Sequence, residues 1–239
     1  MPYTHLPILL TATIAPPSLP GLGALDPGQR WTQYEVALRF WILRRNVSAV
    51  VFCENSGYAV DYAPITNLAA RLGKTLEVMT YSGNEGALTK GRGYGEGEII
   101  RHALVHSVTL SNYPGFFKAT GRLMVTNFNL LEWMTRIHPV VMSERSAFDH
   151  GWVDTRFYKM DRQFYMDHLL NVHCQADRPD WVLGKGYARV LAPRRVPSFP
   201  LAVRIVGESG NGVRYDDDAW RYVVKSMLAQ VGYYCIRRS

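Results

Sequence analysis

Two segments of the sequence combine glycines with cationic side chains, a combination that binds phosphate groups in many proteins. Residues 90–98 read Lys-Gly-Arg-Gly-Tyr-Gly-Glu-Gly-Glu, and residues 117–122 read Phe-Lys-Ala-Thr-Gly-Arg. Glycines let backbone N–H groups approach an anion closely, and the N-terminus of a following helix adds its dipole. We therefore expect a phosphate-bearing small molecule at these segments. The expected phosphate-binding residues are Lys90, Gly91, Arg92, Gly93, Gly95, Lys118, Thr120, Gly121 and Arg122.

Three carboxylates are candidates for a general base that deprotonates a substrate hydroxyl: Glu54, Glu96 and Asp154. Glu54 directly follows a predicted buried strand, where function explains a carboxylate more readily than folding does. Glu96 has an alternative role, because carboxylates also favour the first turn of a helix. Asp154 has one too, since it can pair structurally with the nearby Arg156. We prefer Glu54 and keep Glu96 and Asp154 as alternatives.

The sequence contains no recognised metal or nucleophile motif. No Asp-x-Asp pair stands at the strand end that holds Lys118 and Arg122, and no His-Glu-x-x-His or Gly-x-Ser-x-Gly pattern occurs. Residues 216–218 are all Asp, but they precede a predicted helix and fit a capping role better than a metal site. We therefore expect no metal cofactor and leave Mg²⁺ or Mn²⁺ open as alternatives.

The elements that position these residues alternate between strand and helix. Apolar runs predict buried strands at residues 8–14, 49–53 and 76–81, and helical spacing predicts helices at 29–45 and 65–72. Strands separated by helices form a mainly parallel sheet with helices on both faces, so the predicted fold class is α/β and Rossmann-like. Ligands bind beyond the carboxyl ends of such strands. That position adds Thr11, Thr13, Asn55 and Ser56 to the expected site.

Later elements complete one predicted domain with a C-terminal elaboration. A helix is expected at residues 95–108, after the glycine-rich loop, and strands at 116–118, 139–143 and 155–158. A final helix carries an apolar stripe formed by Trp220, Val223, Val224, Met227, Leu228 and Val231. We expect residues 1–175 to form the donor-binding and catalytic region. Residues 176–239 would supply a basic segment, a strand and a helix that complete the same domain.

The 239-residue chain has a formal net charge of +7, and part of the excess falls between Arg178 and Arg204. That range holds six cations and one acid, with Trp181, Tyr187 and Phe199 among them. Such a segment suits a surface that contacts anionic lipid or an anionic glycan, and a solvated basic face is the alternative. No nucleic-acid-binding motif occurs, so no nucleic acid partner is expected.

The apolar run near the start of the chain is too short to span a bilayer, and we interpret it as a strand rather than a signal peptide. The three cysteines lack the close spacing of a disulfide framework or a zinc site. We therefore expect a cytoplasmic protein, with peripheral contact at the inner face of the membrane left open.

The ordered motifs of residues 8–170 resemble those of a bacterial family of surface-polysaccharide (capsule and O-antigen, or lipopolysaccharide) biosynthesis proteins, generally taken to be glycosyltransferases. The two most specific motifs are Lys-Gly-x-Gly-Tyr-Gly-Glu at 90–96 and Lys-x-Thr-Gly-Arg at 118–122. They are accompanied by Leu-Thr-Ala-Thr-Ile at 10–14, Glu-Asn-Ser-Gly at 54–57, Asp-Thr-Arg-Phe at 154–157, and Asp26 with Arg30 and Tyr34.

This resemblance implies a GT-A-like fold, a nucleotide sugar or other activated sugar donor, and a glycan or lipid-linked acceptor. It adds Asp26, Arg30 and Arg156 to the candidate site residues. The missing Asp-x-Asp pair departs from the usual pattern of that fold, which puts metal dependence in doubt.

The predicted function is a metal-independent glycosyltransferase that moves a sugar from a phosphate-activated donor to a glycan or lipid-linked glycan. Lys90, Arg92, Lys118 and Arg122 would hold the phosphate leaving group in place of a metal ion. Two alternatives stay open. One is a phosphoribosyl transferase that uses phosphoribosyl pyrophosphate, and the other is a non-catalytic module that binds an anionic glycan or a nucleotide.

Overall fold

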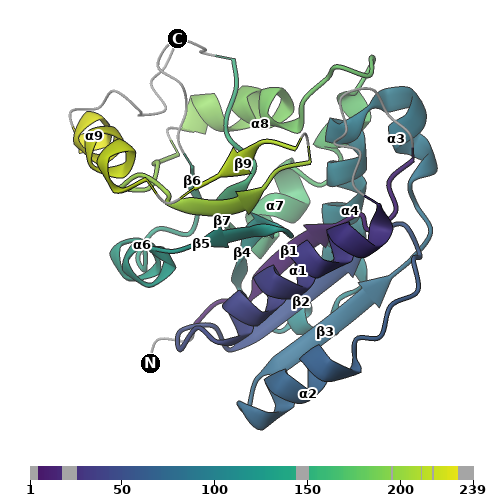
Figure 1. The fold of residues 1–239 in the computed structure, drawn as a ribbon. Helices are drawn as coiled ribbons and strands as arrows, with labels where there is room; N and C mark the ends of the chain where they lie inside the picture. The colour runs from purple at the N-terminus through teal and green to yellow at the C-terminus, as the bar shows by residue number, and fades with distance from the viewer. Residues whose placement is uncertain are drawn as a thin grey trace.

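The computed structural model describes residues 5–17, 26–143, 151–194, 196–210, 212–216 and 218–230. They form an α/β fold around a six-stranded sheet with the strand order β3-β2-β1-β4-β7-β6 (Figure 1). Its strands are β1 (Ile8–Ala12), β2 (Ala49–Glu54), β3 (Thr75–Thr80), β4 (Gly115–Thr120), β6 (Val141–Met142) and β7 (Phe157–Asp161). The predicted α/β class with a mainly parallel sheet is confirmed.

Strands β3, β2, β1 and β4 run parallel, whereas β7 is antiparallel to β4 and β6 is antiparallel to β7. All residues of β1 and β2 are buried, because core clusters cover both faces of the sheet. Leu9 belongs to one cluster and Leu10 to the other, as the alternation of side chains along a strand requires. The carboxyl ends of the four parallel strands therefore meet at one edge, beside the start of β7.

Helices pack on both faces of this sheet. One face carries α1 (Pro27–Ile42), α2 (Ala63–Arg71) and α6 (Phe128–Met134), and the other carries α4 (Arg92–His106), α7 (Arg162–His168) and α8 (Leu183–Leu191). The remaining helices are α3 (Glu85–Lys90), α5 (Val108–Ser111) and α9 (Ala219–Gln230), with 3₁₀ turns at Val172–Gln175 and Ala192–Arg194.

Two aspartates fix the starts of helices. Asp26 caps α1, since its Oδ1 accepts hydrogen bonds from the backbone N–H of Gly28 at 2.8 Å and of Gln29 at 3.0 Å. This cap explains why α1 begins before the predicted start at residue 29. Asp218 Oδ1 accepts from the backbone N–H groups of Trp220 and Arg221 in the same way, so the capping interpretation of this aspartate holds. Asp217 lies outside the described residues.

The glycine-rich segment is helical, so the prediction of a loop up to residue 95 is wrong. Helices α3 and α4 are separated by Gly91 alone. Gly91 has a φ of +84°, and a Cβ there would lie 2.0 Å from the carbonyl oxygen of Pro179. A Cβ on Gly93 would lie 2.6 Å from the carbonyl oxygen of Trp181. These two glycines let α4 pack closely against the segment 179–183, a contact between distant parts of the sequence.

A smaller antiparallel sheet joins β5 (Leu123–Val125), β8 (Ile205–Glu208) and β9 (Arg214–Tyr215) in the order β5-β8-β9. Backbone hydrogen bonds between β5 and β8 therefore join the region beyond residue 175 to the segment that directly follows β4. In Figure 1 the hairpin formed by β8 and β9 lies in front of the main sheet.

The aromatic residues of the basic segment 178–204 are buried. Tyr187 is fully buried and Phe199 is 4% exposed, so the expectation that they form a surface for an anionic partner is wrong. Tyr187 belongs to the core around α4 and α8, and Phe199 stacks on Phe157 with ring centroids 5.3 Å apart. Arg195, one of the six cations of this segment, lies outside the described residues.

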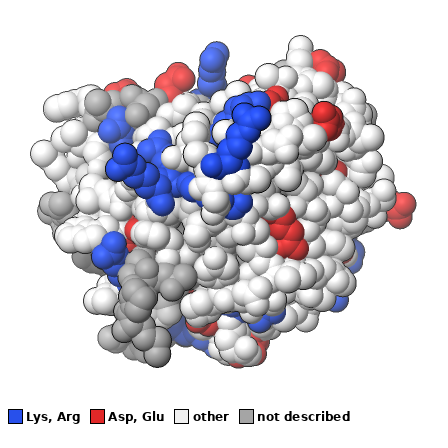
Figure 2. Space-filling view, turned by 90° about the horizontal axis from the view of Figure 1, so that it is seen from below, with Lys and Arg blue, Asp and Glu red and all other residues white. Residues whose placement is uncertain are grey.

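Positive charge gathers in one area of the surface. Figure 2 shows lysine and arginine side chains clustered on the face seen from below, with few carboxylates among them. None of the helices within the described ranges is long and apolar enough to cross a membrane.

Candidate active site

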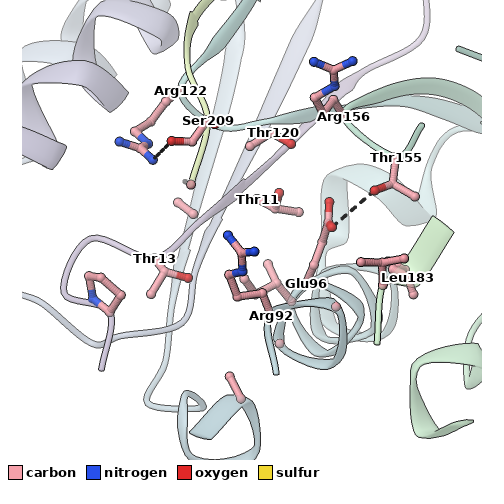
Figure 3. A pocket seen from close by; sticks show the side chains of 18 of the residues that line it. Thr11, Thr13, Arg92, Glu96, Thr120, Arg122, Thr155, Arg156, Leu183 and Ser209 are labelled. Carbon is pink, nitrogen blue, oxygen red and sulfur yellow. Dashed lines mark hydrogen bonds between the residues drawn. The ribbon is translucent and has the colours of Figure 1, made fainter. Parts of the chain in front are cut away.

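A cavity of about 550 Å³ lies at the edge of the sheet where β1 and β4 end, beside the first turns of α4 (Figure 3). Ser209, Gly210 and Tyr215 of the β8–β9 hairpin line it, together with residues 179–184. The predicted site residues that line the cavity are Thr11, Thr13, Arg30, Asn55, Arg92, Gly93, Gly95, Glu96, Thr120, Arg122, Asp154 and Arg156.

The other predicted site residues are not among those that line the cavity. They are Asp26, Glu54, Ser56, Lys90, Gly91, Lys118 and Gly121. Lys90 is exposed, with its Nζ 4.6 Å from the centre of the Tyr94 ring. Gly121 follows β4, where a Cβ would lie 2.6 Å from the carbonyl oxygen of Thr11.

The carboxylate of Glu54 is fully buried and serves the backbone. Its Oε1 accepts hydrogen bonds from the N–H of Ile14 at 2.9 Å and of Ser56 at 2.8 Å, and also from the Ser56 hydroxyl. Its Oε2 accepts from the N–H of Gly57 at 3.0 Å. Four donors therefore satisfy this carboxylate, which ties the chain after β1 to the chain after β2. Folding alone explains why a carboxylate follows this buried strand.

Glu96 projects from the second turn of α4 into the cavity, with its side chain 26% exposed. Oε1 accepts a hydrogen bond from Lys118 Nζ, and Oε2 lies 3.4 Å from the Thr155 hydroxyl (Figure 3). Lys118 is fully buried, and its Nζ also donates to the carbonyl oxygen of Thr155 at 2.8 Å and to the Thr120 hydroxyl at 3.3 Å. All three ammonium protons are thus used within the protein. Lys118 fixes Glu96 and has no donor left for a ligand.

Arg92 begins α4 and extends into the same cavity (Figure 3). It is exposed, and among the described residues none forms a hydrogen bond or an ion pair with it. Arg92 and Glu96 are four residues apart on one helix, a spacing that often gives an ion pair. Because Lys118 and Thr155 hold Glu96, the guanidinium of Arg92 stays available to an anion. The N-terminal dipole of α4 acts in the same direction.

Two further arginines of the cavity hold the backbone around it. Arg30 is 3% exposed, and its Nε and Nη2 donate to the carbonyl oxygen of Thr13 at 3.1 and 2.8 Å. Arg122 donates through Nη2 to the carbonyl oxygen of Ser209 at 2.7 Å and through Nη1 to the side chain of Gln33. Burial lowers the pKa of the Arg122 guanidinium from its usual value. Arg122 therefore anchors the β8–β9 hairpin to the end of β4.

Asp154 and Arg156, which both line the cavity, form an ion pair with each other. Arg156 Nε donates to both carboxylate oxygens of Asp154 at 2.9 Å, and its guanidinium lies 4.8 Å from the centre of the Tyr215 ring. Burial alone would lower the pKa of Arg156, but the hydrogen bonds and the charge of Asp154 raise it above its usual value. The Asp154 side chain is 6% exposed, compared with 26% for Glu96, so Asp154 is less available as a base.

Several residues of the cavity were not predicted. They include Tyr34, Asn84, Trp152, Thr155, Tyr215 and the segment Pro179–Gly184. Tyr34 lies on α1, and its hydroxyl accepts from the N–H of Thr13 at 3.0 Å. Tyr34 and Thr155 belong to the motifs of the family resemblance without an assigned role, and Asn84 follows the predicted strand at 76–81. No local pattern placed the others in the site. The described residues contain no group of three or more His, Cys, Asp or Glu side chains that could hold a metal ion.

Comparison with known proteins gives a likeness of architecture. No protein-family model matches the chain, and no curated protein matches it. The 4-diphosphocytidyl-2C-methyl-D-erythritol synthase of Anaerococcus prevotii is 10% identical, with a TM-score of 0.46, over 95% of this chain and 98% of that chain. The apo form of mouse xyloside xylosyltransferase 1 is 8% identical, with a TM-score of 0.43, over 79% of this chain and 81% of that chain.

Proposed function

We propose that this protein is a glycosyltransferase that moves a sugar from a phosphate-activated donor, such as a nucleotide sugar, to a glycan or lipid-linked glycan. The observation that carries this proposal is the pair formed by Arg92 and Glu96. One turn of α4 presents a fixed carboxylate to this cavity together with a cation that has no partner among the described residues. Transfer of a group from a phosphate requires both, because the leaving group is anionic and the attacking hydroxyl must lose a proton.

In this reaction the acceptor hydroxyl gives its proton to Glu96, and its oxygen attacks the anomeric carbon of the donor sugar. The bond between that carbon and the phosphate oxygen breaks, and the phosphate leaves with the electron pair. Arg92 and the N-terminus of α4 stabilise the negative charge that develops on the leaving group. Lys118 and Thr155 keep the Glu96 carboxylate in place throughout the reaction.

The cavity also offers polar groups for the rest of the donor. Thr13 donates its hydroxyl to Asn55 Oδ1 at 2.6 Å, which fixes the Asn55 amide at the end of β2. Thr13, Arg30 and Asn84 belong to the same lining, and Asn84 Nδ2 donates to the carbonyl oxygen of Ala15 at 3.3 Å. Such groups, held by their own hydrogen bonds, suit the binding of a nucleotide or a sugar without rearrangement.

The test measures donor binding by isothermal titration with a panel of nucleotide sugars and phosphoribosyl pyrophosphate. We expect one nucleotide sugar to bind and Arg92→Ala to weaken its binding by about tenfold to a hundredfold, since a hydrogen bond to a charged group contributes about 1.5–3 kcal/mol. Lys90→Ala is the matched control, because it removes the same charge two residues away without touching the cavity. Lys90→Ala should leave the Kd unchanged.

Three results would contradict the proposal, and a fourth would contradict its metal-independent form. Binding of phosphoribosyl pyrophosphate alone would favour a phosphoribosyl transferase, and the absence of binding to every donor would remove both transferases. Equal effects of Arg92→Ala and Lys90→Ala would show that the cavity does not select the phosphate. Release of the nucleoside diphosphate should continue in EDTA, so a requirement for Mg²⁺ or Mn²⁺ would contradict the metal-independent form of the mechanism.

A further inference from the structure

Helix α9 exposes its apolar stripe and buries a polar residue. Trp220 is 74% exposed and Met227 is 62% exposed, and Val223 and Val224 between them are 38% and 37% exposed. These residues follow the spacing i, i+3, i+4, i+7, which normally faces a protein core. Ser226 is 8% exposed instead, and its hydroxyl accepts a hydrogen bond from the N–H of Ala202 at 3.3 Å. Helix α9 therefore turns its apolar stripe outward and a polar residue inward, whereas a helix that packs on a core does the opposite.

Helix α6 and the turn after it add a second group of exposed apolar side chains. Leu130 is 44% exposed, Trp133 is 59% exposed and Ile137 is 86% exposed. Ala202 joins the two helices, because its N–H donates to Ser226 of α9 and its carbonyl oxygen accepts a hydrogen bond from Asn127 at the start of α6. The distance from Asn127 Nδ2 to this carbonyl oxygen is 2.9 Å. Both helices lie on the left-hand side of the molecule in Figure 1. The α6–α9 surface consists of Leu130, Trp133, Ile137, Trp220, Val223, Val224 and Met227.

The charged side chains of these two helices favour an anionic partner. Arg221 and Lys225 are exposed on α9, and residues 219–230 contain no Asp or Glu. The carboxylate of α6, Glu132, is 1% exposed and is held by His5 and Asn46. Asp218 lies at the start of α9, where it caps the helix. Apolar side chains with tryptophan and exposed cations are the combination that binds the interface of a bilayer with anionic headgroups.

We propose that the α6–α9 surface binds peripherally to a bilayer that contains anionic lipid. A second copy of the chain fits this surface less well, because a two-fold interface would bring the same cations of both copies to one contact. The exposed tryptophans and aliphatic side chains would enter the headgroup region, and Arg221 and Lys225 would contact the lipid phosphates. The proposal is independent of the donor chemistry, since lipid binding is measured without any sugar.

The test is sedimentation of the full chain with vesicles of phosphatidylcholine, with and without phosphatidylglycerol. We expect binding to the vesicles that contain phosphatidylglycerol, and weaker binding at high salt because salt screens the attraction. Trp220→Ala and Met227→Ala should each weaken partition, by about tenfold for the tryptophan. Leu43→Ala is the matched control for Met227→Ala, since Leu43 is 61% exposed and lies at the end of α1.

Four outcomes would overturn the proposal. The first is a wild-type chain that remains in the supernatant with phosphatidylglycerol vesicles at low salt. A second is equal weakening by Leu43→Ala and Met227→Ala, and a third is unchanged partition in Trp220→Ala. The fourth is a wild-type dimer, detected by light scattering, that Trp220→Ala converts to a monomer. That result would assign the surface to a second copy of the chain.

Discussion

At the scale of single residues, the glutamate that ends strand β2 and the glutamate in the second turn of α4 have opposite surroundings. Glu54 is fully buried and accepts four hydrogen bonds, three of them from backbone N–H groups, whereas Glu96 faces the cavity with a lysine behind it. From the sequence both are candidates for the general base, Glu54 at the end of a buried strand and Glu96 near the start of a helix. Burial and partners separate them: Glu54 holds the backbone, and we assign the proton transfer to Glu96.

The pair of variants Glu54→Gln and Glu96→Gln tests this assignment. Glu54→Gln replaces one accepting oxygen by an NH₂ group that faces backbone donors, so we expect the free energy of unfolding to fall by about 1–3 kcal/mol. Glu96→Gln should leave donor binding almost unchanged and reduce turnover by about a hundredfold or more, because the base is lost. Urea denaturation and nucleoside diphosphate release measure the two effects. Normal turnover in Glu96→Gln would remove the residue from the proposed mechanism.

At the scale of elements, the N-terminus of α4 reaches the cavity because small residues let it approach the segment 179–183. A Cβ on Gly93 would lie 2.6 Å from the Trp181 carbonyl oxygen and 2.8 Å from the Leu183 backbone nitrogen. Backbone atoms cannot move aside as a side chain can. The position of Arg92 therefore depends on a packing contact made one residue further along the helix.

We expect Gly93→Ala to lower the free energy of unfolding by about 1–3 kcal/mol, because the added methyl group overpacks the contact between α4 and this segment. The variant should also weaken donor binding by displacing Arg92. Gly210→Ala is the control, since a Cβ at that position has no neighbour within 4 Å. Thermal unfolding of both variants provides the comparison, and equal stability of the two would contradict the packing argument. Donor titration of Gly93→Ala against the wild type measures the displacement of Arg92.

Strand β7 contributes a second element-scale feature, a buried lysine beneath the end of α6. Lys159 is 3% exposed, and its Nζ donates to the Thr135 carbonyl oxygen at 2.6 Å. Burial lowers the pKa of Lys159 from 10.5 to about 8, although Glu132 opposes the change. The folded state therefore binds fewer protons than the unfolded state between these two pKa values.

The stability contributed by Lys159 should accordingly rise with pH between about 8 and 10.5, as the cost of burying the charge disappears. Lys159→Met keeps the aliphatic stem and removes the titration. We expect the free energy of unfolding of the wild type, measured relative to that of Lys159→Met, to rise from pH 7.5 to pH 9.5. Urea denaturation at both pH values measures it, and a constant difference would show that the lysine does not titrate in this range.

At the scale of the whole molecule, the sequence predicted the sheet but only part of the cavity. Buried parallel strands are continuous apolar runs, such as residues 8–12 and 49–53, and their order along the chain determines which ends meet. Thr11, Thr13, Asn55 and Thr120 reach the cavity for this reason. The glycine-rich segment was predicted as a loop and is helical. Its glycines accommodate partners that lie almost ninety residues further along the chain, which no local pattern can indicate. Trp152, Ser209 and Tyr215 belong to segments that only tertiary packing brings to the site.

The shared position of Arg92 and Glu96 on one turn of α4 has a consequence for the range of substrates. Four residues of an α-helix span about 6 Å along its axis. In the proposed mechanism the spacing between the leaving group and the attacking hydroxyl is therefore set by helix geometry, whatever the size of the molecules attached to either. For the proposed glycosyl transfer, changes in the hairpin or in the segment 179–184, which line the same cavity, would alter the acceptor that enters and not the spacing of Arg92 and Glu96. Substitutions in these two segments should therefore change the linkage that is formed.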